Sequence, residues 1–180
     1  MHSIINAFLV LTTHKCSAVN AAVGAAAASM AAAYSQRKQD VASGAAVHAA
    51  ALVTTLDWQA LLQAADDDAV AYAALQQTWK KDCTLTEDEI TVIRRRALEV
   101  PTTLLVQCHA HCRAIHMFWK DGHCNRNITS DAAVGLHALA GSARAAYQTV
   151  MVNSPPAEEK ERLKGLLREI GQMEQDLLDL

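Results

Sequence analysis

The stretch from Gly122 to Asn153 reads GHCNRNITSDAAVGLHALAGSARAAYQTVMVN, and it joins a polar loop to a long apolar helix. The opening loop contains a glycine and two asparagines, which tolerate positive φ and favour turns. Thr129, Ser130 and Asp131 then offer side-chain oxygens to the free N–H groups of a helix start. The remaining run is rich in Ala, Val, Leu and Gly and carries almost no charge. A helix that is apolar on nearly every side belongs in the middle of a helical domain, and on spacing alone the polar residues at its start are capping and turn residues.

The composition of the chain fits one helical domain. Its 180 residues are enough for a single domain with a substantial core. Apolar residues make up 51% of the chain and aromatic residues only 4%, so the core must be built from Ala, Leu and Val. Ala is the best helix former, and only 7 Gly and 3 Pro interrupt the chain. No stretch alternates as a β-strand would. We therefore predict an all-α, single-domain bundle of about five to six helices, two of them long.

Three helices are expected in the first half of the chain. Ser3–Leu11 is predicted to form a short first helix. Cys16–Ser35 forms an Ala-rich second helix, whose small side chains let neighbouring backbones approach closely. A long helix then spans Val41–Thr78, with Leu56–Trp58 and Asp66–Asp68 as the candidate interruptions.

The second long helix has a well-marked start. Thr86 and Glu89 form a capping box, in which each side chain accepts the backbone N–H of the other residue. The helix is predicted to run to Trp119 and to bend at Pro101, because proline lacks an N–H and crowds the preceding turn.

The last helix carries a regular apolar seam. Pro155 and Pro156 stop the preceding helix and open this one, because proline is favoured in a first helical turn. Its apolar residues are spaced 3, 4, 3, 4 and 3 apart, as in a heptad repeat: Leu163, Leu166, Ile170, Met173, Leu177 and Leu180. Such a seam can pack on its own domain or on a partner. We expect residues 155–180 to be a C-terminal amphipathic helix of the same domain as residues 1–154.

Several segments resemble one enzyme family, in the same order along the chain. The residues Gly122, Asn125, Ser130, Asp131 and Asn153 are similar to a motif in the cyclodeaminase domain of formiminotransferase-cyclodeaminase. Bacterial methenyltetrahydrofolate cyclohydrolases of the serine cycle share this domain. Three earlier segments also match the family: Ala22–Ala26 with Met30; Leu62, Ala64 and the run Asp66–Ala69 with Tyr72; and Val100–Pro101. The resemblance covers most of the chain, from position 1 to position 154.

The resemblance implies a homodimeric enzyme of folate one-carbon metabolism. The family's substrates carry a cationic C–N unit at N5 and N10 of tetrahydrofolate, either a methenyl bridge or a formimino group. Hydrolysis of the bridge needs a water activated by a base, and cyclodeamination needs an acid that helps ammonia to leave. A carboxylate near the cation serves both reactions, by charge stabilisation and by proton transfer. We therefore expect a cyclohydrolase or a cyclodeaminase that acts on a tetrahydrofolate derivative.

The same resemblance assigns roles to particular residues. Asp131 is the favoured catalytic group, because it lies beside the loop and matches the family's Ser-Asp pair. The family's glycine run should fall at positions 12–15, where His14 and Lys15 stand instead. These two residues can supply proton transfer or a counter-charge for the glutamate tail, or they can be loop residues of a site that no longer works. The residues expected to bind substrate are Asn125, Asn127, Ser130, Asn153 and Asp67.

Two other interpretations stay open. A catalytically degenerate family member would keep the fold as an assembly or binding module, with its last helix contacting a partner. A weaker alternative is a metal-binding protein, because Cys108, His109, Cys112 and His116 are ligand types that zinc prefers. A closed zinc site needs four assured ligands, and the fourth would have to come across the following loop. We therefore expect no metal.

Charge and hydropathy argue against two classes of partner. The net charge of −3 and the scattered basic residues do not form the basic face of a nucleic-acid-binding protein. Ala18–Ala33 is apolar but shorter than the roughly 20 residues of a membrane span. Met1–Leu11 lacks the basic start of a signal peptide. The odd number of cysteines, 5, suits reduced thiols. We expect a cytoplasmic homodimer or higher homo-oligomer.

Overall fold

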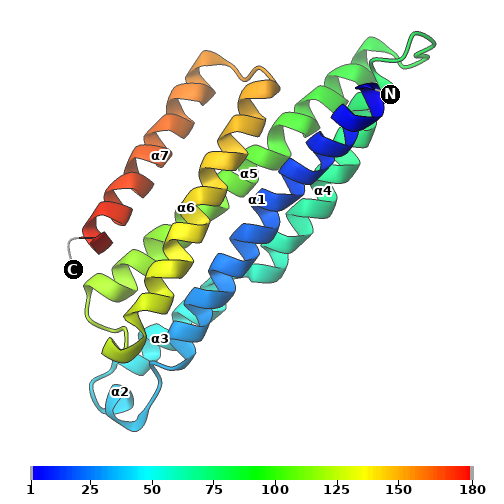
Figure 1. Cartoon of the computed structure of the whole chain (residues 1–180). Helices are drawn as coiled ribbons and strands as arrows, with labels where there is room; N and C mark the ends of the chain where they lie inside the picture. The colour runs from blue at the N-terminus through cyan, green and yellow to red at the C-terminus, as the bar shows by residue number, and fades with distance from the viewer. Residues whose placement is uncertain (1, 179–180) are drawn as a thin grey trace.

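In the part of the chain that the structure describes, all regular structure is helical, which confirms the all-α prediction. The structure is a computed structural model that describes the backbone of residues 2–178 and the side chains of residues 16–178. The helices in chain order are α1 (His2–Ala33), α2 (Lys38–Ala42), α3 (Ala45–Thr55), α4 (Trp58–Gln77), α5 (Glu87–Lys120), the 3-10 helix η1 (Arg126–Ile128), α6 (Thr129–Val152) and α7 (Ala157–Leu178). They pack as one elongated bundle (Figure 1).

The centre of the bundle is the contact between α1 and α6, which lie side by side in Figure 1. Both helices are rich in small residues, so their backbones meet at two glycines. A Cβ atom added to Gly24 would lie 2.8 Å from the carbonyl oxygen of Gly135, and one added to Gly135 would lie 2.7 Å from that of Gly24. The α1 helix is continuous, so the separate short helix predicted for Ser3–Leu11 was wrong.

The long helix predicted for Val41–Thr78 is divided in two places. Gly44 separates α2 from α3 with a φ of 81°, a backbone conformation that glycine adopts without steric cost. The second interruption falls at Leu56 and Asp57, one of the two predicted sites, and Asp57 Oδ1 accepts the N–H of Ala60 at 2.9 Å as the cap of α4. The acidic run at residues 66–68 continues inside α4 without a break.

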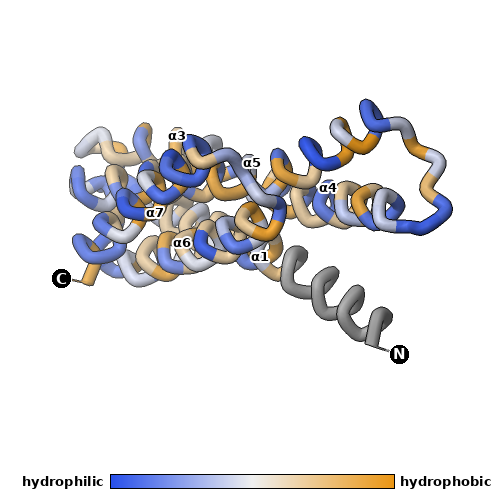
Figure 2. The backbone as a smooth tube through the Cα atoms, turned by 90° about the horizontal axis from the view of Figure 1, so that it is seen from above, coloured by the Kyte–Doolittle hydropathy of each residue, from blue (hydrophilic) through white to orange (hydrophobic). Residues whose placement is uncertain are grey.

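The start of α5 is the predicted capping box. The N–H of Glu89 donates to Thr86 Oγ1 at 3.3 Å, and the N–H of Thr86 donates to the Glu89 carboxylate at 2.8 Å. These bonds lower the pKa of Glu89 below its ordinary value. The helix continues through Pro101 and ends at Lys120. The turn that joins α4 to α5 lies at the opposite end of the bundle from the loop that joins α5 to α6 (Figures 1 and 2).

The start of α6 differs from the prediction. The helix begins at Thr129, so Ser130 lies inside its first turn and does not cap it. The chain enters through η1, and the residue at the cap position, Ile128, makes no side-chain capping bond. The capping residue of this region is Asn125, whose side-chain oxygen accepts the N–H of Asn127 at 3.1 Å.

The last helix packs on its own chain. Leu163, Ile170, Met173 and Leu177 of the heptad seam are buried, and α7 lies against α5 and α6. Of the two possibilities that the sequence leaves open, packing on the same domain or on a partner, the structure shows packing on the same domain.

Two segments are long and apolar enough to cross a membrane by length and composition alone, Cys16–Ala33 and Ala45–Gln77. The first segment is the central helix of the bundle, and such core helices pass the same test. The second is divided between α3 and α4 at Asp57. These two segments are therefore weak evidence for a membrane protein.

Candidate functional site

The loop between α5 and α6 is tied to the end of α1 by Asn125. Its backbone N–H donates to Ser35 Oγ at 2.8 Å, and its side-chain Nδ2 donates to the carbonyl oxygen of Tyr34 at 3.2 Å. Asn125 is buried, and its side-chain oxygen holds the N–H of Asn127. The amide that sequence reasoning assigned to substrate binding therefore positions the loop in this structure.

A polar depression of about 340 Å³ lies between this loop and α2. Its lining residues come from the two segments: Arg37, Gln39, Asp40, Ser43, Ala45 and Gly122 through Asn127. Arg37 Nε and Nη2 donate to the two carboxylate oxygens of Asp40 at 2.8 and 3.1 Å, and these bonds lower the pKa of the Asp40 carboxyl. The His123 ring stacks on His48 of α3 with centroids 3.8 Å apart.

Asp131 and Ser130 lie close to this loop, in the first turn of α6. Asp131 is half-buried and Ser130 is exposed, and Ser130 Oγ lies 3.5 Å from Asp131 Oδ2. A carboxylate in the first turn of a helix is stabilised by the helix dipole. Asp131 therefore lies at a helix N-terminus, where solvent can reach it.

Asn153 lies at the other end of α6. Its Nδ2 donates to the carbonyl oxygen of Ala97 in α5 at 2.9 Å and to that of Thr149 at 3.2 Å. At 1.5 Å per residue, about 33 Å of helix separates Asn153 from Asp131. Within one chain the structure does not bring these two predicted site residues together.

The three adjacent aspartates of α4 lie in three different environments. Asp66 is exposed. Asp67 is half-exposed, lies 3.6 Å from Arg96, and lines an apolar groove of about 260 Å³ between α4 and α5. Asp68 instead lines a small crevice of about 10 Å³ inside the bundle.

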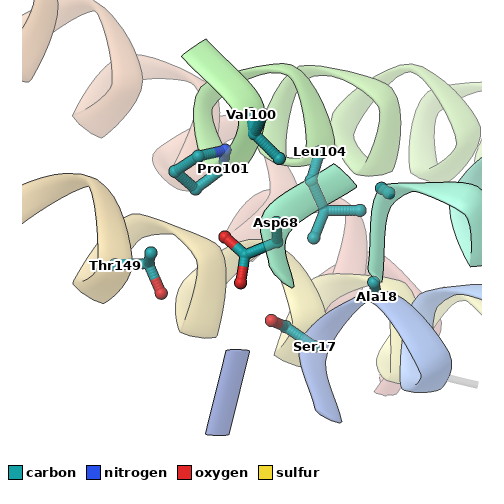
Figure 3. A pocket seen from close by; sticks show the side chains of 8 residues that line it. Ser17, Ala18, Asp68, Val100, Pro101, Leu104 and Thr149 are labelled. Carbon is teal, nitrogen blue, oxygen red and sulfur yellow. The ribbon is translucent and has the colours of Figure 1, made fainter. Parts of the chain in front are cut away.

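Figure 3 shows this crevice, with the Asp68 carboxylate directed toward the hydroxyls of Ser17 and Thr149. Four helices contribute to it, because Ser17 belongs to α1, Asp68 to α4 and Thr149 to α6, while α5 supplies the apolar wall. That wall is formed by Val100, Pro101 and Leu104. The crevice has room for about one water molecule. The crevice combines a carboxylate and two hydroxyl groups with an apolar wall. Such a setting is suited to proton transfer.

Sequence reasoning singled out Asp67, and the signal that distinguishes Asp68 is the phase of the helix. Leu61 and Ala65 are buried positions of α4, and Asp68 follows them at the spacing of 4 and then 3 residues that keeps side chains on one face. The run of three aspartates alone does not show which of them faces the core, because the buried face of α4 must first be known.

The side chains of His14 and Lys15 lie outside the residues whose side chains the structure describes. Their positions belong to α1.

The cysteine and histidine side chains of α5 diverge. Cys108 and Cys112 point into the core and are fully buried, and burial raises the pKa of the Cys108 thiol to about 12. His109 and His116 face carboxylates of α7. Among the residues whose side chains are described, no three His, Cys, Asp or Glu side chains come together in a way that could hold a metal ion.

Comparison with known proteins shows the family of this chain. The sequence profile described as formiminotransferase-cyclodeaminase matches residues 15–172, which is most of the chain. The protein belongs to the formiminotransferase-cyclodeaminase family. The family resemblance read from the sequence motifs is thereby confirmed.

A solved relative shares the fold of this family member. The structure of this chain is similar to that of the formiminotetrahydrofolate cyclodeaminase of Thermotoga maritima, with a TM-score of 0.78 at 17% sequence identity. The match covers 93% of this chain and 87% of the other chain. No curated protein matches the sequence. At this identity, the likeness to the solved structure is a likeness of fold.

Proposed function

We propose that this member of the formiminotransferase-cyclodeaminase family is an enzyme acting on the N5–C–N10 one-carbon unit of tetrahydrofolate. The observation that carries the proposal is the carboxylate of Asp68, which is held beside two hydroxyls at the junction of four helices (Figure 3). The family match over residues 15–172 makes a folate derivative the expected substrate.

Both candidate reactions use a carboxylate in the same way. In cyclodeamination, N10 closes on the formimino carbon, the bond to the terminal nitrogen breaks, and a proton must reach the departing ammonia. In hydrolysis, water adds to the methenyl carbon, loses a proton to a base, and one C–N bond opens to give the formyl product. A fixed carboxylate stabilises the cationic carbon electrostatically and can carry the proton in either direction.

We infer that the complete site is formed by two chains. The Asn125–Asp131 region and the Asp68 crevice lie about 27 Å apart along α6, as estimated from Asp131 to Thr149 at 1.5 Å per residue. A two-fold axis perpendicular to α6 near Gly141 would bring the beginning of this helix in one protomer to its end in the other. Asp131 and Asp68 would then belong to one site across the interface.

The exposed face of α1 and α6 suits such an interface. Val23 of α1 and Val134 of α6 are 59% and 60% exposed, and Gly141 is exposed near the middle of α6. Asn20 donates to the carbonyl oxygen of Ala138 at 2.9 Å on this face, so α1 and α6 present it as one surface. A continuous apolar surface of small residues is typical of a subunit contact.

In this composite site most of the predicted residues keep a proposed role. Asp131 and Asp68 supply carboxylates for the cationic carbon and for proton transfer. His14 and Lys15 shortly precede Ser17 in the sequence of α1, and proton transfer or a counter-charge is their proposed role. Substrate positioning is proposed for Asn127, Ser130 and Asn153, and Asn125 contributes by holding the loop. Asp67 lies in the separate groove between α4 and α5, so Asp68 takes the place at the site that the sequence assigned to Asp67. No metal is required, and a homodimer or higher homo-oligomer in the cytoplasm is the proposed setting.

The dimer can be tested with one pair of variants. Val23→Glu places a charge at the centre of the proposed interface and should convert a dimer to a monomer in analytical ultracentrifugation. Val92→Glu is the matched control, because Val92 is 53% exposed in the groove between α4 and α5. A wild-type protein that sediments as a monomer at micromolar concentration would rule out the composite site.

The reaction itself is followed by the absorbance of the methenyl group. Mixed with formiminotetrahydrofolate, a cyclodeaminase raises this absorbance above the buffer control. Mixed with methenyltetrahydrofolate, a cyclohydrolase lowers it faster than buffer does.

The second candidate function is a catalytically degenerate assembly or binding module. The observation that favours it is that positions 12–15, where the family's glycine run is expected, belong to the α1 helix. A protein of this kind would form the dimer but would neither bind folate nor change the absorbance of either substrate.

A further inference from the structure

Helix α7 is held to the bundle by three histidine–carboxylate contacts. His109 Nε2 lies 2.7 Å from Glu169 Oε2, and His116 Nε2 lies 2.8 Å from Asp176 Oδ2. Each histidine of α5 stands 60 positions before its carboxylate in α7, and the two pairs are two helical turns apart, so they form a ladder in register. The third contact comes from α6.

The third contact is between His137 of α6 and Glu174 of α7. His137 Nδ1 lies 3.1 Å from Glu174 Oε1, and Arg144 donates to the same carboxylate. All three carboxylates of the ladder are in the C-terminal half of α7. The N-terminal half has pairs within α7 itself, such as Arg162 with Glu159 at 2.7 Å.

We propose that this histidine ladder is a proton-dependent latch, which holds the C-terminal half of α7 against α5 and α6 more tightly below the titration range of imidazole than above it. The inference is independent of the proposed folate chemistry. It rests on the placement of three imidazoles opposite three carboxylates along a single helix.

Two of the ladder carboxylates, Glu174 and Asp176, are favoured in their ionised form by their bonding partners. Burial raises the pKa of Glu174, but the bonds from Arg144 and His137 outweigh this effect and leave the pKa below its ordinary value. Bonds from Gln172 and His116 lower the pKa of Asp176. Imidazole is the side chain that changes charge between about pH 5 and pH 8. A protonated imidazole facing a carboxylate is a full ion pair, and a neutral one keeps only a hydrogen bond.

Other ionisable groups also lie near the ladder. Arg144 shares Glu174 with His137 and keeps its charge, so this part of the latch persists at high pH. Lys120 lies near enough to Asp176 to lower the pKa of that carboxyl. Arg113 stands one helical turn after His109 on α5. Beneath Glu174, the Cys112 thiol is neutral because burial raises its pKa.

Opening of the latch would uncover the seam that α7 buries. Ile170 and Met173 lie between the ladder carboxylates in the sequence of α7, Leu177 directly follows Asp176, and all three side chains are buried. Raising the pH therefore loosens a surface made of apolar side chains, while the N-terminal half of α7, which has ion pairs of its own, stays in place.

Hydrogen exchange of α7 tests the latch in the full-length protein. After correction for the intrinsic exchange rate, the opening equilibrium constant of the segment 169–176 should rise about tenfold between about pH 6 and pH 8. The expected change is of this size because each partly exposed ion pair typically changes this constant by only a small factor. The variant His109→Gln/His116→Gln/His137→Asn keeps hydrogen-bonding groups near Nε2 and Nδ1 without a titratable proton. Its opening should match that of the wild type at high pH and should not respond to pH.

Two controls keep the test decisive. His48→Gln removes an exposed histidine that stacks on His123 and faces no α7 carboxylate, so its α7 exchange should be that of the wild type. If the triple variant does not fold, a double-mutant cycle of His109→Gln with Glu169→Gln should give a coupling at pH 6 that shrinks at pH 8. Equal opening of the wild-type segment at both pH values, or a pH-independent coupling, would overturn the proposal.

Discussion

His111 is a buried imidazole with one ring nitrogen unpaired in the part of the chain that the structure describes. It is 8% exposed, and its Nδ1 has no hydrogen-bond partner among the residues that the structure describes. Burial lowers the pKa of His111 below 6.5, and the nearby charge of Asp57 only partly offsets this effect. The native state therefore favours neutral His111. In the unfolded chain, this side chain takes up a proton as the pH falls below the ordinary pKa of histidine.

This difference predicts a loss of stability in acid. The free energy of unfolding should be independent of His111 above about pH 7 and should fall as the pH drops from about 6.5 toward the lower native pKa, by about 1.4 kcal/mol for each pKa unit of the shift. His111→Leu should flatten this part of the curve in urea unfolding, whereas His48→Gln should leave it unchanged. A His111→Leu curve as steep as that of the wild type would contradict the assignment.

At the scale of single residues, the sequence identifies chemical types better than environments. The polar loop around Asn125 and the acidic run of α4 were both recognised, but the sequence does not contain the bonds from Asn125 to the end of α1. It also favoured Asp67 over Asp68, because the inward face of α4 is decided by contacts with α1 and α5. Ser130 looked like a helix cap because the preceding η1 turn leaves only weak signals.

At the scale of helices, the close contact of α1 and α6 depends on two glycines. A methyl group at Gly24 would meet the Gly135 carbonyl oxygen at 2.8 Å and the Ala138 Cβ at 2.9 Å. Gly24→Ala should lower the free energy of unfolding by about 1–3 kcal/mol, because neither backbone can move without separating the helices. This loss should exceed the gain that alanine usually brings to a helix.

Gly171→Ala is the control for this prediction. A Cβ at Gly171 in α7 meets nothing within 4 Å, so the variant should be neutral or more stable by up to about 1 kcal/mol. Urea unfolding of both variants measures the difference. Equal stabilisation by the two substitutions would mean that α1 and α6 do not approach as closely as the structure shows.

The helices themselves were predictable where a local signal fixed them. The Thr86–Glu89 capping box and the Pro155–Pro156 stop are local, and both were correct. The sequence does not predict the division of the Val41–Thr78 segment at Gly44, because one glycine inside an apolar run can be tolerated in a helix or can end it. The packing of α7 on its own chain was undecided, because a heptad seam fits either partner, and its histidine contacts come from α5 and α6.

At the scale of the whole molecule, the all-α class followed from composition, and the family followed from ordered motifs. The site did not follow, because its predicted residues lie at two ends of the bundle. Within one chain Asp131 and Asn153 lie at opposite ends of α6, and only the proposed dimer would bring them to one site. The central claim is therefore a folate site shared across a homodimer, with Asp131 from one chain and Asp68 from the other.

Subunit complementation tests this claim most directly. In the methenyl absorbance assay, Asp131→Asn and Asp68→Asn should each fold as dimers and lose about 10²–10⁴-fold of the wild-type turnover. When the two variants are co-expressed, about half of the dimers are mixed, and each mixed dimer has one intact site and one doubly substituted site. The account predicts recovery of about a quarter of the wild-type turnover. A mixture as inactive as either variant alone, or a wild-type protein that leaves the absorbance of both folate substrates at the buffer rate, would contradict it.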